Sequence, residues 1–527
     1  MSCVITKEIK GRQYLYESVS YRDDNGQPRT RRKFIGKIEP GTGVRIYSKE
    51  YIERMTTEGR LTEINTDIKR YSDNDIKRSK MLEYGASYLY KRIAEEIGLY
   101  RVLQEAIPDA WKEVFTVACY LVSNDEPVMY CNDWVEKTDG LPVRALSASG
   151  ISRLFKDGIG IHQRNEFYRR WAAYRQEREY LAIDISSASS YSKFISEVEW
   201  GHNRDKEKLP QVNLCLIMGE ESKNPVYQIP YSGSITDVTT LRTTLKLASH
   251  LSLGELKLVM DKGFYKKRNI DILLADGTTK FITAASFNAD YVCKLVESSK
   301  HSIDRADNAI LLGEDTILGM TREVKWDSEH SLYAHVYHNA IGAAVAKTEL
   351  YGFAASLAEI ARADPHSEKH AKKFDKYLAI NKTPDAQLTV NIRQDVLEGQ
   401  LATSGWLVLL SNHISDASKA IHIYRAKDAV EKGFDRFKNS LDMKRLRVHS
   451  SEGMENKAFV AFIGLILISR IHKVMSEKNL YLHMTMKRLV HTLEKLRVQF
   501  IDENRVLFPL TKQQSDIYDA FGFDAPV

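Results

Sequence analysis

Two segments of this chain read as buried β-strands, and each carries a single aspartate in a mostly apolar pattern. Asp184 lies in the middle of residues 180–186 (YLAIDIS), and Asp261 ends residues 256–261 (LKLVMD). A carboxylate inside a buried strand is costly because desolvation disfavours its ionised form, so such a group usually has a cation beside it. A third acid, Glu431, lies in a stretch with helical period. Three carboxylates so far apart in the sequence predict one site that the fold assembles.

The phase of the helical stretch supports the third acid. At about 100° per residue, four polar side chains fall within one narrow sector: Tyr424, Lys427, Glu431 and Lys438. The apolar residues of the same stretch gather in a separate stripe about 80° away. One long helix packed on a sheet would have these two stripes, with one acid aimed at the strand carboxylates. The alternative is a solvent-facing ion pair between Lys427 and Glu431, which is common four residues apart but does not explain the two aspartates.

The N-terminal region alternates like a β-hairpin. Two alternating segments within residues 12–37 flank residues 23–26 (DDNG), and Asn-Gly is a strong signal for a tight turn. The second segment carries the densest basic cluster of the chain: Arg29, Arg31, Arg32 and Lys33. The net charge of +6 only weakly favours a nucleic-acid partner. The cluster is therefore either a phosphate-binding surface or an ordinary solvated face.

Residues 76–178 have helical period, and within them residues 147–155 read as a capped helix that presents Ser152 and Arg153. That helix is either a DNA-reading helix or a plain surface helix. From residue 180 the pattern becomes α/β, with five predicted strands: 180–186, 211–218, 225–230, 256–261 and 279–284. A helix is expected after Thr236, with Asp237 more suited to cap it than to bind a metal.

The stretch between residues 285 and 411 interrupts this pattern. It contains strand-like pieces near 316–326 and 331–337, an Ala-rich helix near 339–363 and a strand at 406–410. A connection of this length is rarely a structureless loop, so it predicts an inserted domain. Its position before the third acid suggests that it closes over a bound substrate rather than supporting the core sheet.

Several classes of protein are disfavoured by composition. The five cysteines are odd in number and form no Cys-x-x-Cys pair, so neither a disulfide framework nor a thiolate zinc site is indicated. The N-terminus has no apolar segment typical of a signal peptide. The most apolar stretch, residues 458–468, is shorter than the roughly 20 residues that span a bilayer, and is expected to form a buried helix. We therefore expect a cytoplasmic protein without a membrane partner.

Together these motifs resemble insertion-sequence DDE transposases of the ribonuclease H-like superfamily. The helix residues are similar to the family signature Y-x2-R-x3-E-x6-K, and the surroundings of Asp184 and Asp261 are similar to its first and second acidic motifs. The large insertion before the third acid is also typical of the group. Lys427 and Lys262 stand where the family usually has arginine. They keep the charge but lose the bidentate phosphate geometry of a guanidinium group.

The resemblance implies that Asp184, Asp261 and Glu431 are catalytic residues that hold two Mg²⁺ ions, with Mn²⁺ as an accepted substitute, about 3.5–4 Å apart. Carboxylate oxygens suit Mg²⁺. It implies that Tyr424, Lys427 and Lys438 position DNA phosphates. The expected activity is binding of the terminal inverted repeats of an insertion sequence, followed by metal-dependent DNA cleavage and strand transfer.

The expected partners are double-stranded DNA, at the transposon ends and the target, and a second copy of the chain on that DNA. Residues proposed for DNA binding outside the catalytic helix are Arg29, Arg31, Arg32, Lys33 and Arg153. Two alternatives remain open: a non-catalytic DNA-binding protein derived from a transposase, and a metal-dependent nuclease of the same fold without strand transfer.

The expected fold class is α/β, a ribonuclease H-like mixed sheet core interrupted by an inserted domain, with an N-terminal β-hairpin and helical region. The expected domains are, in chain order: 1–75, β-hairpin and linker; 76–178, helical DNA-binding region; 179–285, first part of the core; 286–412, inserted domain; 413–475, second part of the core with the catalytic helix; and 476–527, C-terminal region.

Overall fold

The computed structural model describes residues 2–9, 12–39, 45–58, 79–174, 179–201, 207–235, 241, 256–382, 388–501 and 504–527. The chain divides into two compact units: Met1–Lys80 with Gln499–Val506, and Met81–Val498 with Leu507–Val527. The helix expected after Thr236, and the cap expected at Asp237, lie outside the described residues.

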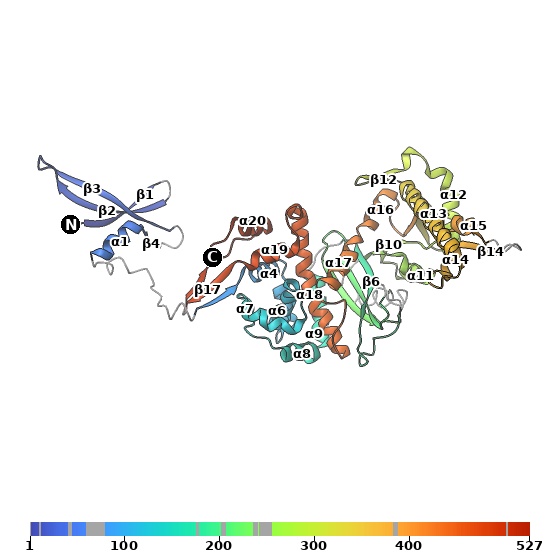
Figure 1. Ribbon diagram of the computed structural model, residues 1–527, viewed down its shortest axis with the longest axis horizontal. Coiled ribbons are helices and arrows are strands. Elements are labelled where there is room, and N and C mark those ends of the chain that lie inside the picture. The colour runs from blue at the N-terminus through green and yellow to red at the C-terminus, as the bar shows by residue number, and fades with distance from the viewer. Residues whose placement is uncertain are drawn as a thin grey trace. The chain divides into compact units, whose positions relative to one another are not determined.

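The N-terminal unit contains a four-stranded antiparallel sheet in the order β1-β2-β3-β4, with one helix (Figure 1). Its elements are β1 (Ser2–Ile9), β2 (Arg12–Arg22), β3 (Pro28–Ile38), β4 (Arg45–Tyr47) and α1 (Lys49–Thr57). The predicted hairpin is confirmed, because Arg22 pairs with Pro28. Its turn closes where the N–H of Gly26 donates to the carbonyl of Asp23 (2.8 Å), and Gly26 has the positive φ of 76° that such a turn favours. The hairpin is thus the middle of a larger sheet.

The second unit is built around a mixed nine-stranded sheet in the order β11-β12-β13-β16-β10-β9-β6-β7-β8. Its strands are β6 (Leu181–Ser189), β7 (Gln211–Gly219), β8 (Pro225–Ser232), β9 (Lys257–Met260), β10 (Lys280–Ala284), β11 (Ala309–Leu312), β12 (Asp315–Lys325), β13 (Ser331–His338) and β16 (Trp406–Ser411). Neighbours β6, β9 and β10 run parallel, and every other neighbouring pair is antiparallel. The five strands predicted between residues 180 and 284 are therefore confirmed in type and closely in position.

The insertion takes part in this sheet. β16 pairs with β10 on one side and with β13 on the other, and β12 and β11 follow outward. The expectation that the insertion does not support the core sheet is therefore wrong, because an unpaired strand edge leaves backbone groups without partners and β13 satisfies those of β16. The rest of the insertion comprises α12 (Asp290–Ile303), α13 (Ala340–Ala363), α14 (Ala371–Tyr377), β14 (Leu378–Lys382), β15 (Leu388–Ile392) and α15 (Gln394–Leu401).

Helices surround a long central helix, α18 (Ser451–Glu477), which packs against α6 and α8. The region before the sheet contains β5 (Lys80–Glu83), α4 (Gly85–Glu96), α5 (Leu99–Ala106), α6 (Trp111–Ser123), α7 (Cys131–Lys137), α8 (Ala148–Asp157) and α9 (Ile161–Tyr174). The C-terminal region contains α19 (Met486–Glu494), β17 (Arg497–Ile501), β18 (Asn504–Leu507) and α20 (Lys512–Phe521). Its two strands were not expected from the sequence.

Among the described residues, α18 is the one helix long and apolar enough to cross a membrane, at 27 residues. Its most apolar window is 83% buried inside the protein, as for the core helix of a folded domain. The predicted buried helix is confirmed, but at 27 residues it is long enough to span a bilayer, so the argument from its short length does not hold. Burial against neighbouring helices is what distinguishes it from a membrane span.

Candidate active site

The two strand aspartates lie at the same height on adjacent parallel strands. β6 and β9 pair with Ile183 opposite Met260, so the next residue on each strand is an aspartate, Asp184 and Asp261. Neighbouring strands are about 4.8 Å apart, and residues at equal height share one face of the sheet. Asp261 follows the last residue of β9 but keeps extended backbone angles (φ −76°, ψ 166°). The strand register therefore brings these two acids together, as the prediction of one shared site requires.

Two helices pack on the face of the sheet that carries these aspartates: α16 (Ala417–Arg425) and α17 (Asp428–Asn439). Val259 of β9 belongs to the same apolar cluster as Ile421 of α16. Leu216 of β7, the cross-strand partner of Asp184, lies beside Gly433 of α17. Because α16 contacts β9 and β10 while α17 contacts β6 and β7 (Figure 1), the junction between the helices lies over the boundary of β6 and β9, where the acids are.

The single long helix expected here is wrong, because the chain tightens between α16 and α17. The N–H of Lys427 donates to the carbonyl of Tyr424 (3.2 Å), and the N–H of Val430 donates to that of Lys427 (2.9 Å). These bonds join residues three apart, which is the 3₁₀ pattern. The tightened turn redirects the chain from one half of the sheet to the other while keeping Tyr424, Lys427 and Glu431 above the acids.

Gly433 allows α17 to approach the sheet closely. A Cβ atom at this position would lie 2.2 Å from Sδ of Met218 on β7, far inside van der Waals contact. Glycine in a helix interior costs about 0.5–1 kcal/mol relative to alanine, so close approach is the reason for its presence here. The depth of α17 above β7 in turn sets the position of Glu431, two residues earlier in the same helix.

Four side chains meet at the helix junction. The hydroxyl of Tyr424 donates to Oδ1 of Asp261 (3.2 Å), and Nζ of Lys427 lies 3.9 Å from the same oxygen. Lys427 also forms an ion pair with Glu431. Lys427 thus joins the second acid to the third, while Tyr424 binds the second acid alone. The ion pair between Lys427 and Glu431, which was the alternative interpretation of this helix as a solvent-facing surface, does exist. However, the Lys427 side chain is only 17% exposed, and it also lies 3.9 Å from Asp261 on the sheet.

The charges of all three acids act on this cluster. Burial, and then the charge of Asp261, raises the pKa of Tyr424, with smaller contributions from Glu431 and Asp184. Burial alone would lower the pKa of Lys427, but the hydrogen bond that its ammonium group donates to Glu431 and the charges of Asp261, Glu431 and Asp184 outweigh burial and raise the pKa. Tyr424 is therefore held as a neutral phenol and Lys427 as an ammonium ion.

The donor chemistry of the site suits a divalent cation. Three carboxylates and one ammonium group carry a formal charge of −3 + 1 = −2, and carboxylate oxygens are the ligands that Mg²⁺ and Mn²⁺ prefer. Within the described part of the chain, no three His, Cys, Asp or Glu side chains already converge as a metal-binding group. Lys427 lies between Asp261 and Glu431 and supplies the positive charge there.

The other predicted site residues occupy different parts of the fold. Lys438 follows on α17 with its side chain 8% exposed. Arg153 is exposed on α8, whose first turn is capped by the side chain of Ser147 as predicted. The basic cluster of residues 29–33 is exposed on β3 of the N-terminal unit. Arg29 forms an ion pair there with the turn residue Asp23, with 3.0 Å between Nε and Oδ2.

The register of the N-terminal sheet divides its basic residues between two faces. Helix α1 covers the face of Leu15, where its Arg54 pairs with Glu17 (2.6 Å). Arg31 and Lys33 lie opposite Val19 and Glu17, on that face. The register shifts by one residue here, because Leu15 pairs with Gly36 whereas Tyr16 pairs with Phe34. Ile35 is therefore an extra residue in β3, a bulge, and it lies with Gly36 on the face of Leu15.

The opposite face of this sheet was missed by the sequence reasoning. Tyr14 and Tyr16 contact Phe34, at ring distances of 6.2 and 5.9 Å, and Phe34 is 47% exposed. Five cations share the face with these rings, by their registers: Lys7, Arg12, Arg22, Arg32 and Lys37. Among the described strand residues this face carries no acid. The alternation of the hairpin could have separated the two faces, but only as far as the bulge, which the sequence does not reveal.

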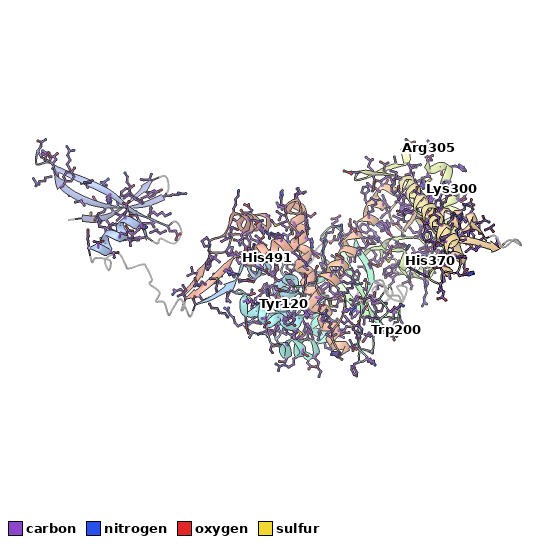
Figure 2. All side chains as sticks on the ribbon, in the orientation of Figure 1. Tyr120, Trp200, Lys300, Arg305, His370 and His491 are labelled. Carbon is purple, nitrogen blue, oxygen red and sulfur yellow. The ribbon has the colours of Figure 1, made fainter. Side chains whose placement is uncertain are left out.

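A second exposed aromatic group follows β6. Tyr191, Phe194 and Trp200 are 68%, 81% and 69% exposed, and Trp200 is labelled in Figure 2. The guanidinium of Arg445 lies 5.4 Å from the ring centre of Tyr191 and donates to its hydroxyl (3.0 Å). Arg445 forms an isolated bridge with Ser189, the last residue of β6. The strand that carries Asp184 is therefore followed by a segment with exposed aromatic side chains, one of which contacts Arg445.

Comparisons with known proteins identify the family of the chain. The family model described as "Transposase DDE domain" matches residues 175–467. No curated protein matches the chain. The solved structures that match include the piggyBac transposase synaptic complex with hairpin DNA, at 10% identity and a TM-score of 0.32, over 76% of this chain and 70% of that one; that likeness is too distant to bear on the site. The family match spans more than half of the chain and contains all three acids, and the chain therefore belongs to the transposase DDE domain family.

Proposed function

We propose that this protein binds the terminal inverted repeats of its own insertion sequence and catalyses metal-dependent DNA cleavage and strand transfer. The observation that carries the proposal is the convergence at one helix junction: Asp184 and Asp261 at equal height on adjacent strands, with Glu431 joined to Asp261 through Lys427. The order β8-β7-β6-β9-β10, in which only β7 runs against the others, supports a ribonuclease H-like core.

In this proposal Asp184, Asp261 and Glu431 hold the divalent ions. Bound Mg²⁺ or Mn²⁺ would supply Lewis-acid activation of the attacking oxygen and stabilisation of the leaving one. The protein side chains do the remaining work. Tyr424, kept neutral, offers a hydroxyl donor, and Lys427, kept charged, offers an ammonium donor to phosphate oxygens. Lys438, about two turns beyond Glu431 along α17, is proposed to position the same DNA.

The test uses the full chain with duplexes that end in the inverted repeats of its element. Wild type should nick these ends in Mg²⁺, and Asp184→Asn or Asp261→Asn should bind the same DNA without nicking it. Joining of the released 3′-hydroxyl ends to a target plasmid would separate a transposase from a nuclease of the same fold. Binding by wild type without any metal-dependent cleavage would refute the enzymatic proposal and favour a DNA-binding derivative.

End recognition is proposed to reside in the N-terminal unit and in α8, through Arg153. Of the β3 cluster, Arg32 lies on the exposed aromatic face, while Arg31 and Lys33 share their face with Glu17 and α1. Phosphate contacts add a salt-dependent contribution to binding, about 0.9 in the log–log slope for each one. Arg32→Ala with Lys37→Ala should therefore flatten the salt slope by nearly two, and Arg31→Ala with Lys33→Ala should flatten it less. Equal slopes for both double variants and wild type would exclude the cluster from DNA contact.

Two active sites acting on two element ends imply a homodimer on DNA. Light scattering of the protein with and without end duplexes would measure this assembly. A complex with one chain per pair of ends would contradict it.

A further inference from the structure

The side of α17 that is turned away from the acids lines a cavity of about 290 Å³ against α18. At about 100° per residue around the axis of α17, Lys432 and Arg436 lie to one side of Asp428, and Glu431 lies to its other side. The cavity and Glu431 are therefore on different faces of the helix. The cavity is lined by five lysines and arginines: Lys223, Arg425, Lys432, Arg436 and Lys473. The one carboxylate among its described lining residues is Asp428, so these groups carry a formal charge of 5 − 1 = +4.

The positive charge of this cavity is mostly uncompensated within the protein. Lys432 is paired with Asp428 (2.5 Å). The guanidinium groups of Arg425 and Arg436 form no hydrogen bond or ion pair with a residue in the described part of the chain. Arg436 is partly buried, and that burial lowers its pKa even though Asp435 and Asp428 act in the opposite direction. A guanidinium group that is desolvated without a partner is unfavourable, because buried charges are normally paired.

A buried hydroxyl group points to the same conclusion independently. Ser469 of α18 is 1% exposed and lines this cavity. Its Oγ atom has no hydrogen-bond partner among the described residues. Buried polar atoms are nearly always satisfied, so an orphaned hydroxyl at a cavity wall indicates a missing partner. Hydroxyl, guanidinium and ammonium groups together are the kinds of donor that bind phosphate oxygens.

We propose that this cavity between α17 and α18 binds a phosphate group, through Arg425, Arg436, Lys473 and the hydroxyl of Ser469. The source that its position favours is the backbone of DNA held at the neighbouring acids, since one helix, α17, lines the cavity and carries Glu431. That source rests on the proposed function, whereas phosphate binding itself does not. The site would then hold DNA from the back of the catalytic helix, and a free phosphate compound is the other source.

The first experiment measures phosphate binding without DNA or metal. Thermal unfolding of the full chain is followed during titration with inorganic phosphate, against sodium chloride at equal ionic strength. Wild type should show a saturable rise in the unfolding midpoint with phosphate only. Arg436→Gln with Lys473→Gln should abolish this rise, and Lys419→Gln, an exposed lysine on α16 outside the cavity, should retain it. A wild-type response equal in phosphate and chloride would overturn the proposal.

Ser469→Ala gives a signature that a structural role would not produce. Removing an orphaned hydroxyl should leave the unfolding midpoint of the phosphate-free protein unchanged or higher, while weakening phosphate binding severalfold. A lower midpoint without phosphate, together with unchanged phosphate affinity, would show that the hydroxyl serves packing and would contradict its assignment.

The second experiment identifies the source of the phosphate. If it is the DNA backbone, Arg436→Gln with Lys473→Gln should reduce the salt slope of end binding by about 0.9 for each lost contact. If a free phosphate compound is bound instead, the salt slope stays at the wild-type value while the phosphate-dependent midpoint shift disappears. Nicking by the same variants on a saturating amount of DNA is measured in parallel, so a failure of the enzymatic proposal remains separate from a failure of this one.

Discussion

Replacing Glu431 by glutamine tests the assignment that depends most on the tertiary structure. The change keeps the size of the side chain and removes the charge that a cation needs. The ion pair with Lys427 is lost, but the Glu431 side chain is 51% exposed, and exposed pairs four apart on a helix contribute only about 0.3–0.5 kcal/mol. Lys427 keeps Asp261 as a partner at 3.9 Å. The free energy of unfolding should therefore fall by less than about 1 kcal/mol.

The effect on cleavage should be far larger. A metal ligand stabilises charge that develops in the transition state, and a loss of about 4 kcal/mol corresponds to a rate about 10³-fold lower. The assay is Mg²⁺-dependent nicking of an inverted-repeat duplex, with gel-shift binding and thermal unfolding measured on the same preparations. Binding and the unfolding midpoint should stay close to wild type while nicking collapses.

Matched controls are available on the same helix. Asp435 is an exposed carboxylate of α17 whose partner is Asn439 (2.7 Å), so Asp435→Asn should nick at the wild-type rate. Asp184→Asn and Asp261→Asn should resemble Glu431→Gln, and double variants should add little, because residues that act as one unit are not additive. Near-normal nicking by Glu431→Gln would refute the reasoning and reduce the Lys427–Glu431 pair to a surface contact.

Three further outcomes are expected. Gly433→Ala should depress cleavage and stability together, because the new methyl group would lie 2.2 Å from Sδ of Met218; Met218→Ala in the same chain should restore part of both, and an additive double variant would contradict the steric cause. Deleting residues 290–403 should give an aggregating protein in size-exclusion chromatography, because it removes β13 and uncovers the edge of β16; a monodisperse, cooperatively unfolding product would show that the insertion is dispensable for the sheet. Burial, together with the charge of Glu83, raises the pKa of Glu494, which follows His491 on α19 (Figure 2), from 4.5 to about 7. Its neutral form is therefore favoured in the folded state, and stability is lost as pH rises from about 4.5 to 7. Glu494→Gln should accordingly raise the unfolding free energy by up to about 3 kcal/mol at pH 8 and change it little at pH 4.5, and an equal effect at both pH values would exclude the ionisation as the cause.

Local patterns were sufficient for the elements that carry the acids. The apolar runs around Asp184 and before Asp261 predicted β6 and β9 because fully buried strands need apolar side chains on both faces. The phase of Tyr424, Lys427 and Glu431 predicted one polar stripe, which the structure keeps despite the break between α16 and α17. The Asn-Gly turn and the Ser147 cap were likewise readable, since both depend on residues adjacent in sequence.

Some features could not be read from local patterns, because they depend on contacts between residues far apart in the chain. The pairing of β13 with β16 depends on which strand edge is left free after β10 is in place. The cavity behind α17 depends on how closely α18 packs, and its orphaned Ser469 hydroxyl has no signature in sequence.

The sequence by itself therefore determined which residues carry charge into the core, the type of the five strands between residues 180 and 284, and the membership of a transposase family. Only the tertiary structure decided that the insertion completes the sheet, that the junction of α16 and α17 lies over the boundary of β6 and β9, and that Lys427 pairs with two acids at once. The physical reason is that periodicity reports the environment of a side chain, apolar or polar. Strand edges, helix depth and shared ion pairs are settled by hydrogen bonds and packing between distant segments.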